Sequence, residues 1–303
     1  MLKARKYLIV VTGPTAVGKT AFSVRLANHY DTEILSADSR QFYREMRIGT
    51  AYPEAEELMA VPHHFIGNLS VTDAYNVSRY ENEALDLLEL LYAKKDVVVL
   101  TGGSGLYIDA VCKGIDELPE HDPALRKTLK EQLKNEGLPA FGKRLQALDP
   151  EYYEVVDQNN PNRLLRAMEV CIQTGQTYTS LRKNKARPRP FGMIKIGLNM
   201  EREALFRRIG ERVDTMMEKS LLEEVNALLP FRGYNALNTV GYKELFSYID
   251  GNMSLEEAVD KIKTNTRRYA RRQLTWFKRD AEIQWFNNDD FDAALSYISK
   301  RMQ

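Results

Sequence analysis

The chain has 303 residues, 28% of them charged, and its 43 Lys and Arg residues balance 42 Asp and Glu residues to a net charge of +1 at pH 7. This length suits one large domain or two modest ones, and the near-neutral balance excludes a global attraction to nucleic acid, so any such binding must come from local clusters. No segment approaches the roughly 18 apolar residues of a membrane span, and Cys112 and Cys171 lie far apart without metal-ligand spacing, so we expect a cytoplasmic protein that does not contact membranes.

Residues 13–20 read Gly-Pro-Thr-Ala-Val-Gly-Lys-Thr, a complete P-loop between an apolar run and a helical pattern over 19–30. Gly13 and Gly18 let the backbone turn so that its amides converge on an anion, beside the positive N-terminus of the helix. Lys19 adds a charge for phosphate oxygens, and the Thr20 hydroxyl is placed to ligate Mg²⁺. We therefore expect the whole loop to bind a di- or triphosphate through Gly13, Pro14, Thr15, Ala16, Val17, Gly18, Lys19 and Thr20.

Short apolar runs typical of buried parallel strands recur at residues 7–12, 32–36, 96–101 and 193–198, with a candidate last strand at 282–286. Helical patterns alternate with these runs, among them residues 75–94 and 201–229. The alternation predicts an α/β fold with a doubly wound parallel sheet of the P-loop NTPase type.

Residues 114–191 break this pattern, because they contain helical segments and no strand-like run. We expect a helical domain inserted into a core formed by residues 1–113 and 192–303.

Asp38 follows the second strand run, so its carboxylate should lie at the same edge of the sheet as the P-loop. Two functional roles are open from the residues alone: a ligand of Mg²⁺, or a general base near the transferred group. A helix N-cap is the structural alternative.

A glycine-rich loop, Thr101-Gly102-Gly103-Ser104-Gly105, follows the next strand run. P-loop hydrolases commonly carry an Asp for Mg²⁺ at this place. Its replacement by Thr and two glycines argues against ordinary ATP or GTP hydrolysis, and the glycines would let the backbone approach a ligand closely.

Residues 261–280 contain eight Lys and Arg residues and one acid, with Arg267 and Arg271 one helical turn apart. Unrelieved like-charge pairs are unfavourable in an isolated helix, so the pattern indicates a polyanionic partner. The alternative is a solvated basic helix that Trp276 and Phe277 anchor to the core.

These motifs together resemble bacterial tRNA dimethylallyltransferases, in the order found in that family and over nearly the whole chain. The motifs that carry the resemblance are the P-loop, Ser-Ala-Asp-Ser-Arg-Gln-Phe-Tyr from residue 36, Thr-Gly-Gly-Ser-Gly-Leu-Tyr from 101, Asn-Arg-Leu-Leu-Arg from 162, Thr-Val-Gly-Tyr-Lys-Glu from 239 and Arg-Arg-Gln-Leu-Thr-Trp-Phe from 271.

The resemblance implies transfer of a dimethylallyl group from dimethylallyl diphosphate to the exocyclic N6 amine of the adenosine 3′-adjacent to the anticodon, position 37, in tRNAs that read codons starting with U. The P-loop would then hold the donor's diphosphate rather than ATP. Asp38 matches the general base, while Lys19, Thr20, Arg212 and Mg²⁺ would stabilise the departing diphosphate.

The resemblance also implies which residues contact tRNA: Asp38, Ser39, Arg40, Gln41, Ser104, Arg126, Asn162, Arg163, Leu164, Leu165, Arg166, Asn238, Thr239, Val240, Gly241, Tyr242 and Lys243. To these the basic helix adds Arg267 and Arg271. Position 104 is usually Thr in the family, and Ser keeps the hydroxyl.

Three other functions remain as alternatives. An adenylate isopentenyltransferase would use a free nucleotide, which needs neither a helical insertion nor a basic helix. A P-loop small-molecule kinase would need ATP at the loop, and a nucleic-acid-binding P-loop protein would transfer no allyl group. We expect a monomer.

Overall fold

The computed structural model describes residues 6–183 and 185–303. Its centre is a parallel sheet with the strand order β3-β2-β4-β1-β5-β6. The strands are Tyr7–Thr12 (β1), Ile34–Ser36 (β2), His63–His64 (β3), Val97–Thr101 (β4), Gly192–Asn199 (β5) and Gln284–Asn287 (β6). The predicted α/β fold is confirmed, and β3 is an edge strand that the sequence analysis missed because two histidines make no apolar run.

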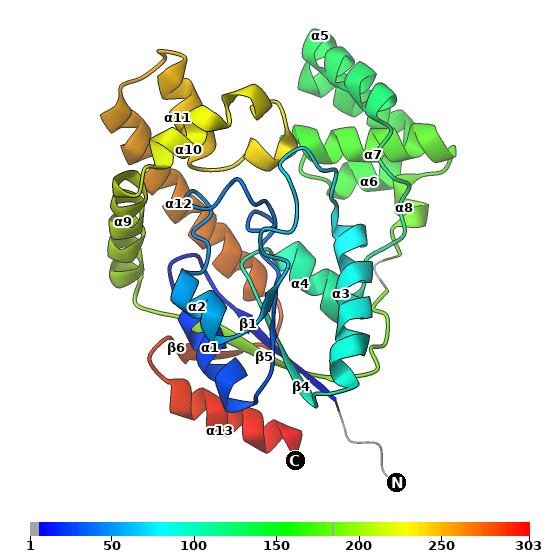
Figure 1. The fold of residues 1–303 in the computed structure, drawn as a ribbon. Helices are drawn as coiled ribbons and strands as arrows, with labels where there is room; N and C mark the ends of the chain where they lie inside the picture. The colour runs from blue at the N-terminus through cyan, green and yellow to red at the C-terminus, as the bar shows by residue number, and fades with distance from the viewer. Residues whose placement is uncertain (1–5, 184) are drawn as a thin grey trace. The chain divides into compact units, whose positions relative to one another are not determined.

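The side chains of β1 alternate between two hydrophobic cores, as the period of a strand requires. Leu8 and Val10 pack with residues of helices α3 (Val77–Tyr92) and α4 (Gly105–Lys113) on one face of the sheet. Ile9 packs with residues of α1 (Lys19–His29) and α13 (Phe291–Met302) on the other face (Figure 1). With helices on both faces, β1 is completely buried, and the P-loop leaves the sheet at its carboxyl end.

The other helices around the sheet are α2 (Ala55–Ala60), α9 (Arg202–Glu218), α10 (Leu221–Ala227), α11 (Tyr242–Ile249) and α12 (Leu255–Phe277), with 3₁₀ turns at Leu229–Phe231 and Asn235–Leu237. The prediction of one helix over 201–229 is wrong. Ser220 has a left-handed φ of 69°, which ends α9 and turns the chain into α10. The helix that carries the basic residues begins at Leu255, because Ser254 forms a capping box with Glu257.

The chain divides into two compact units. One contains the residues up to Cys112 together with Arg189–Gln303, and the other is Lys113–Pro188. The second unit contains α5 (Pro123–Leu148), α6 (Pro150–Val155), α7 (Pro161–Thr174) and α8 (Tyr178–Leu181). A non-helical Gly137, with φ 80°, divides α5 into two helical segments.

Both cysteines are buried, and neither forms a disulfide. Within the described part of the chain, no helix combines the length and the apolar character that crossing a membrane would require.

Candidate active site

The P-loop is a tight turn between β1 and α1, and the backbone conformation of the turn requires glycine at positions 13 and 18. Gly13 has φ 144°, and a Cβ there would lie 2.5 Å from the carbonyl oxygen of Leu198, so no side chain fits. Gly18 has φ 103° and directly precedes the first turn of α1, where no side chain caps the free amides. The loop therefore presents unsatisfied backbone donors at a helix N-terminus, which is an anion site.

Lys19 reaches back over the loop, and its Nζ donates to the carbonyl oxygens of Gly13 at 3.0 Å and Pro14 at 2.8 Å. Burial lowers the pKa of Lys19 to about 8, although the Asp38 carboxylate acts in the opposite direction, and Arg212 lowers it further. A bound anion would reverse this shift. The ammonium group is therefore placed for a phosphate.

The loop borders a cavity of about 820 Å³, here called the P-loop cavity. Lys19 and Thr20 line it, and Asp38, Gln41 and Arg212 line it from other segments. Thr101 and Gly102, at the end of β4, also line this cavity. Asp38 and the P-loop therefore lie at the same edge of the sheet, as the sequence predicted.

Asp38 lies just beyond the end of β2, in a turn. Its Oδ1 accepts a hydrogen bond of 3.1 Å from the backbone amide of Arg40. The N-cap alternative is wrong, because no helix begins between residues 39 and 54, all of which the structure describes. The carboxylate borders the P-loop cavity and also a second cavity, so it lies between two spaces.

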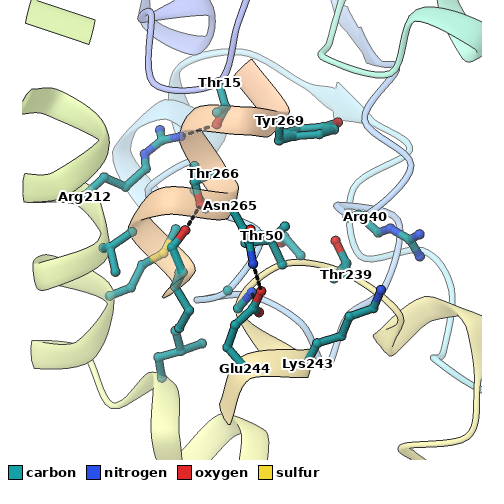
Figure 2. A pocket seen from close by; sticks show the side chains of 18 of the residues that line it. Thr15, Arg40, Thr50, Arg212, Thr239, Lys243, Glu244, Asn265, Thr266 and Tyr269 are labelled. Carbon is teal, nitrogen blue, oxygen red and sulfur yellow. Dashed lines mark hydrogen bonds between the residues drawn. The ribbon is translucent and has the colours of Figure 1, made fainter. Parts of the chain in front are cut away.

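The second cavity has a volume of about 490 Å³ and is here called the α12 cavity, because Asn265, Thr266, Tyr269 and Arg272 of that helix line it (Figure 2). It shares with the P-loop cavity the residues Thr15, Asp38, Thr50, Ala51, Arg212 and Met216. Burial raises the pKa of Tyr269 above its ordinary value, and the Asp38 carboxylate adds to the rise.

Arg212 links the two cavities. Its Nη1 donates to the Thr15 hydroxyl at 3.3 Å, and Figure 2 shows this side chain extending from α9 toward the P-loop. Burial lowers the pKa of Arg212, as does the neighbouring Arg208, while Asp38 raises it.

Ser104 holds the backbone next to Asp38. Its hydroxyl accepts from the Ser39 amide at 2.9 Å and donates to the Ser39 hydroxyl at 3.1 Å. Gln41 donates to the carbonyl oxygens of Thr50 at 3.2 Å and Ala51 at 2.9 Å, both of which border the two cavities. Arg40 reaches the carbonyl oxygens at Asn235 and Ala236 and borders the α12 cavity.

Residues 238–243 form one wall of the α12 cavity, where Asn238, Thr239, Val240, Gly241 and Lys243 line it. Asn265 donates to Glu244 at 2.7 Å at its floor, as Figure 2 shows. Tyr242 is different, because it is completely buried and donates to Glu224 at 2.6 Å. Its side chain therefore supports the loop from inside.

Gln273 is a site residue that the sequence analysis missed. Its Oε1 accepts from the Thr15 amide at 2.8 Å, and its Nε2 donates to the Gly103 carbonyl at 2.9 Å, so it joins the P-loop to the glycine-rich loop. It is only 5% exposed. A signal was available, because Gln273 interrupts the buried stripe of Ala270 and Phe277, and buried amides need partners.

The basic face of α12 is partly stacked on an aromatic ring. The guanidinium groups of Arg267 and Arg271 lie 5.8 and 5.2 Å from the centre of the Phe206 ring. Phe277 is buried, whereas Trp276 is 36% exposed and donates to Asp109 at 2.9 Å. The charged face is present, but of the two aromatic anchors that the sequence suggested only Phe277 reaches the core.

The helical unit holds two of the predicted arginines in ion pairs. Arg126 and Arg166 lie 2.8 and 3.0 Å from the buried carboxylate of Glu169, and His121 contacts the same oxygen. Burial would raise the pKa of Glu169, but these hydrogen bonds and charges bring it below its ordinary value.

Other predicted residues of this unit differ in exposure. Asn162 and Arg163 are exposed at the start of α7. Leu164 and Leu165 are buried in the core of the unit, so their side chains pack against apolar neighbours and present no surface.

Among the described residues, no group of three or more His, Cys, Asp and Glu side chains could hold a metal ion. His63 and His64 have other partners, the Val61 carbonyl oxygen at 2.8 Å and Glu33 at 2.6 Å. A divalent ion at the P-loop would therefore need ligands from a bound anion.

Comparisons with known proteins show the family of the chain. The sequence model described as IPP transferase matches residues 41–280. The chain is 52% identical to a tRNA dimethylallyltransferase 1 of Phocaeicola vulgatus, over 96% of this chain and 97% of that protein, and 50% identical to the one of Bacteroides thetaiotaomicron, over 96% and 94%. A crystal structure of a tRNA isopentenylpyrophosphate transferase from Bacillus halodurans has a TM-score of 0.72 and 35% identity, covering 99% of this chain and 97% of that one. The chain belongs to the IPP transferase family.

Proposed function

We propose that the protein transfers a dimethylallyl group from dimethylallyl diphosphate to the N6 amine of adenosine 37 of tRNAs that read codons starting with U. The observation that carries the proposal is the place of Asp38, whose carboxylate borders both cavities. A group-transfer site needs one space for the donor, one for the acceptor and a base where they meet.

The P-loop cavity suits the donor. As the bond between the allyl carbon and its oxygen breaks, the electron pair leaves with the diphosphate, where negative charge develops. Lys19, Arg212 and the amides at the start of α1 face this charge and stabilise it. The P-loop then acts as a cradle for a leaving group, and hydrolysis of ATP has no part in the reaction.

Mg²⁺ fits the P-loop cavity as a partner of the diphosphate. Thr20 lines the cavity beside Lys19, and its hydroxyl is an oxygen ligand of the kind that Mg²⁺ accepts together with phosphate oxygens. When bound, the ion would supply further positive charge for the leaving diphosphate.

The α12 cavity suits the acceptor base, which must leave its stack in the anticodon loop to enter. The N6 amine forms a bond to the allyl carbon and releases its proton to the Asp38 carboxylate. Tyr269 and Asn265 supply a ring and an amide in the wall of this cavity.

The remaining tRNA contacts are proposed on surfaces whose residues are exposed or half-buried, with the exception of the buried Gly241. In the core unit these are Ser39, Arg40, Gln41, Asn238, Thr239, Val240, Gly241, Lys243, Arg267 and Arg271, and in the helical unit Arg126, Asn162, Arg163 and Arg166. We assign Ser104, Leu164, Leu165 and Tyr242 to the support of these surfaces, because their side chains are engaged or buried.

The test offers radiolabelled dimethylallyl diphosphate with an anticodon stem-loop, with AMP, or with a stem-loop whose position 37 is not adenosine. We expect product only on the first. Product on AMP alone would identify an adenylate isopentenyltransferase, and phosphoryl transfer from ATP without prenylation would identify a kinase.

A further inference from the structure

Arg208 is a cation beside the P-loop to which the proposed reaction assigns no role. It lies one turn before Arg212 on α9, and both arginines border the P-loop cavity with Lys19. Its guanidinium reaches the loop, because a Cβ built on Gly18 would lie 3.8 Å from Nη2 and 4.0 Å from Nη1 of Arg208. Gly18 precedes the free amides of α1, so the guanidinium lies next to an anion site.

The Arg208 guanidinium has no partner within the part of the chain that the structure describes, either as a hydrogen bond or as an ion pair. Arg212, in contrast, contacts the Thr15 hydroxyl. An unpaired cation is common on a solvated surface, and Arg208 is itself exposed, but it lines a cavity that four other cations, Lys19, Arg47, Arg212 and Lys219, also line.

The charges around the P-loop cavity are not balanced by its own carboxylates. Lys19, Arg208 and Arg212 form a cluster of like charges, and positively charged residues four apart on a helix repel each other. Of the carboxylates that line the cavity, Glu54 pairs with Lys219 at 2.8 Å. Asp38 and Glu57 remain for these three cations and for Arg47, which also lines the cavity. This arrangement favours an anion that carries more than one negative charge.

The two arginines differ in which cavity they border. Arg212 lines both cavities and lies on the side of Asp38, whereas Arg208 lines only the P-loop cavity. Side chains four apart on a helix have Cβ atoms about 5–6 Å apart, so both guanidinium groups can reach one diphosphate.

We propose that Arg208 binds the terminal phosphate of the donor diphosphate, while Arg212 stabilises the phosphate next to the bond that breaks. This inference rests on the proposed function. Arg208 then contacts the donor and its product, inorganic diphosphate, and makes no contact with the RNA.

The test compares Arg208→Gln with Arg207→Gln. Arg207 is the matched control, because it is an exposed neighbour on α9 that lines neither cavity. For Arg208→Gln we expect the KM for dimethylallyl diphosphate and the inhibition constant of inorganic diphosphate each to rise about tenfold, which is typical for the loss of one charge-assisted hydrogen bond. The KM for the stem-loop should stay unchanged, and Arg207→Gln should alter none of the three constants.

Arg208→Lys should recover part of the loss, because Lys keeps the charge without the paired donors of a guanidinium. Equal donor and diphosphate constants in Arg208→Gln and Arg207→Gln would overturn the inference, and so would a rise confined to the KM for RNA. A failure of the proposed function would be visible earlier, because the unmodified enzyme would then neither prenylate the stem-loop nor be inhibited by diphosphate.

Discussion

The two cavities that meet at Asp38 are built in opposite ways. The P-loop cavity takes the centre of its anion site from one continuous segment, residues 13–20, which supplies backbone amides and the Lys19 ammonium group, and α9 adds Arg208 and Arg212. The α12 cavity is assembled from side chains of α11, α12 and the loops around residues 50 and 240 (Figure 2). A diphosphate is the same chemical group in every enzyme, so backbone amides can bind it, whereas recognition of a nucleobase in its RNA context requires specific side chains.

This difference predicts which kinetic constants a variant of each cavity should change. Changes in the P-loop cavity should alter the constants for the donor, and changes in the α12 cavity those for the RNA. Residues that join the two cavities should alter both or affect the chemical step. The predictions below test this division, beginning with the largest expected effect.

Asp38→Asn should reduce kcat about a thousandfold, within the range expected for loss of a general base. The amide has the same shape and can still accept the hydrogen bond from the Arg40 amide, so the KM values for donor and stem-loop should change little. Steady-state kinetics with each substrate varied in turn would measure this. A variant with near-normal kcat would show that another group accepts the proton and that Asp38 only separates the cavities.

Gln273→Met should lower kcat/KM for both substrates about tenfold, because two hydrogen bonds of a buried amide are lost. Thr275→Ala is the control on the same helix, since that hydroxyl is exposed and bonds only to the Arg271 carbonyl. A loss for the donor alone would show that Gln273, which lines the P-loop cavity, does not act on the RNA site. A lowered melting temperature with unchanged kinetics would reduce its role to stability.

The parts of the site that could be predicted from the sequence are those in which the signal is local. The P-loop, with its strand and helix, and the position of Asp38 at the end of the next strand follow from adjacent residues and from the rule that ligands bind at the carboxyl edge of a parallel sheet. The core strands were found for the same reason, because each is a continuous apolar run.

What could not be predicted depends on partners far away in the chain. Gln273 acts through Thr15 and Gly103, and no local pattern shows those contacts. The left-handed backbone of Ser220 could not be predicted either, because the periodic pattern of apolar residues continues across it from α9 into α10. Leu164 and Leu165 were assigned by resemblance to a tRNA-contacting segment, and only the packing of the helical unit shows their side chains to be buried.

Glu169→Gln extends the comparison to the helical unit, whose described residues line neither cavity. Removing the charge leaves Arg126 and Arg166 without their shared carboxylate, so we expect the free energy of unfolding to fall by about 2 kcal/mol. The affinity for the stem-loop should fall about fivefold, because two arginines lose their fixed positions. Glu151→Gln, an exposed acid on α6, is the control. The KM for the donor should stay constant, and a change in it would contradict the division between donor and RNA sites.

Arg271→Gln should have the smallest effect, a loss of about threefold in affinity for the stem-loop at moderate salt, with the slope of log affinity against log salt reduced by about one. Arg271 lies 5.2 Å from the centre of the Phe206 ring, and Arg25 on α1 lies 3.8 Å from that of Phe291, so Arg25→Gln removes the same charge from a similar stacked position that borders neither cavity. Binding isotherms of both variants over a range of salt concentrations separate a phosphate contact from a stacking contact that only stabilises the fold. If the two variants have equal salt slopes, the basic face of α12 does not contact RNA phosphates, and the α12 cavity must recognise the base without help from that face.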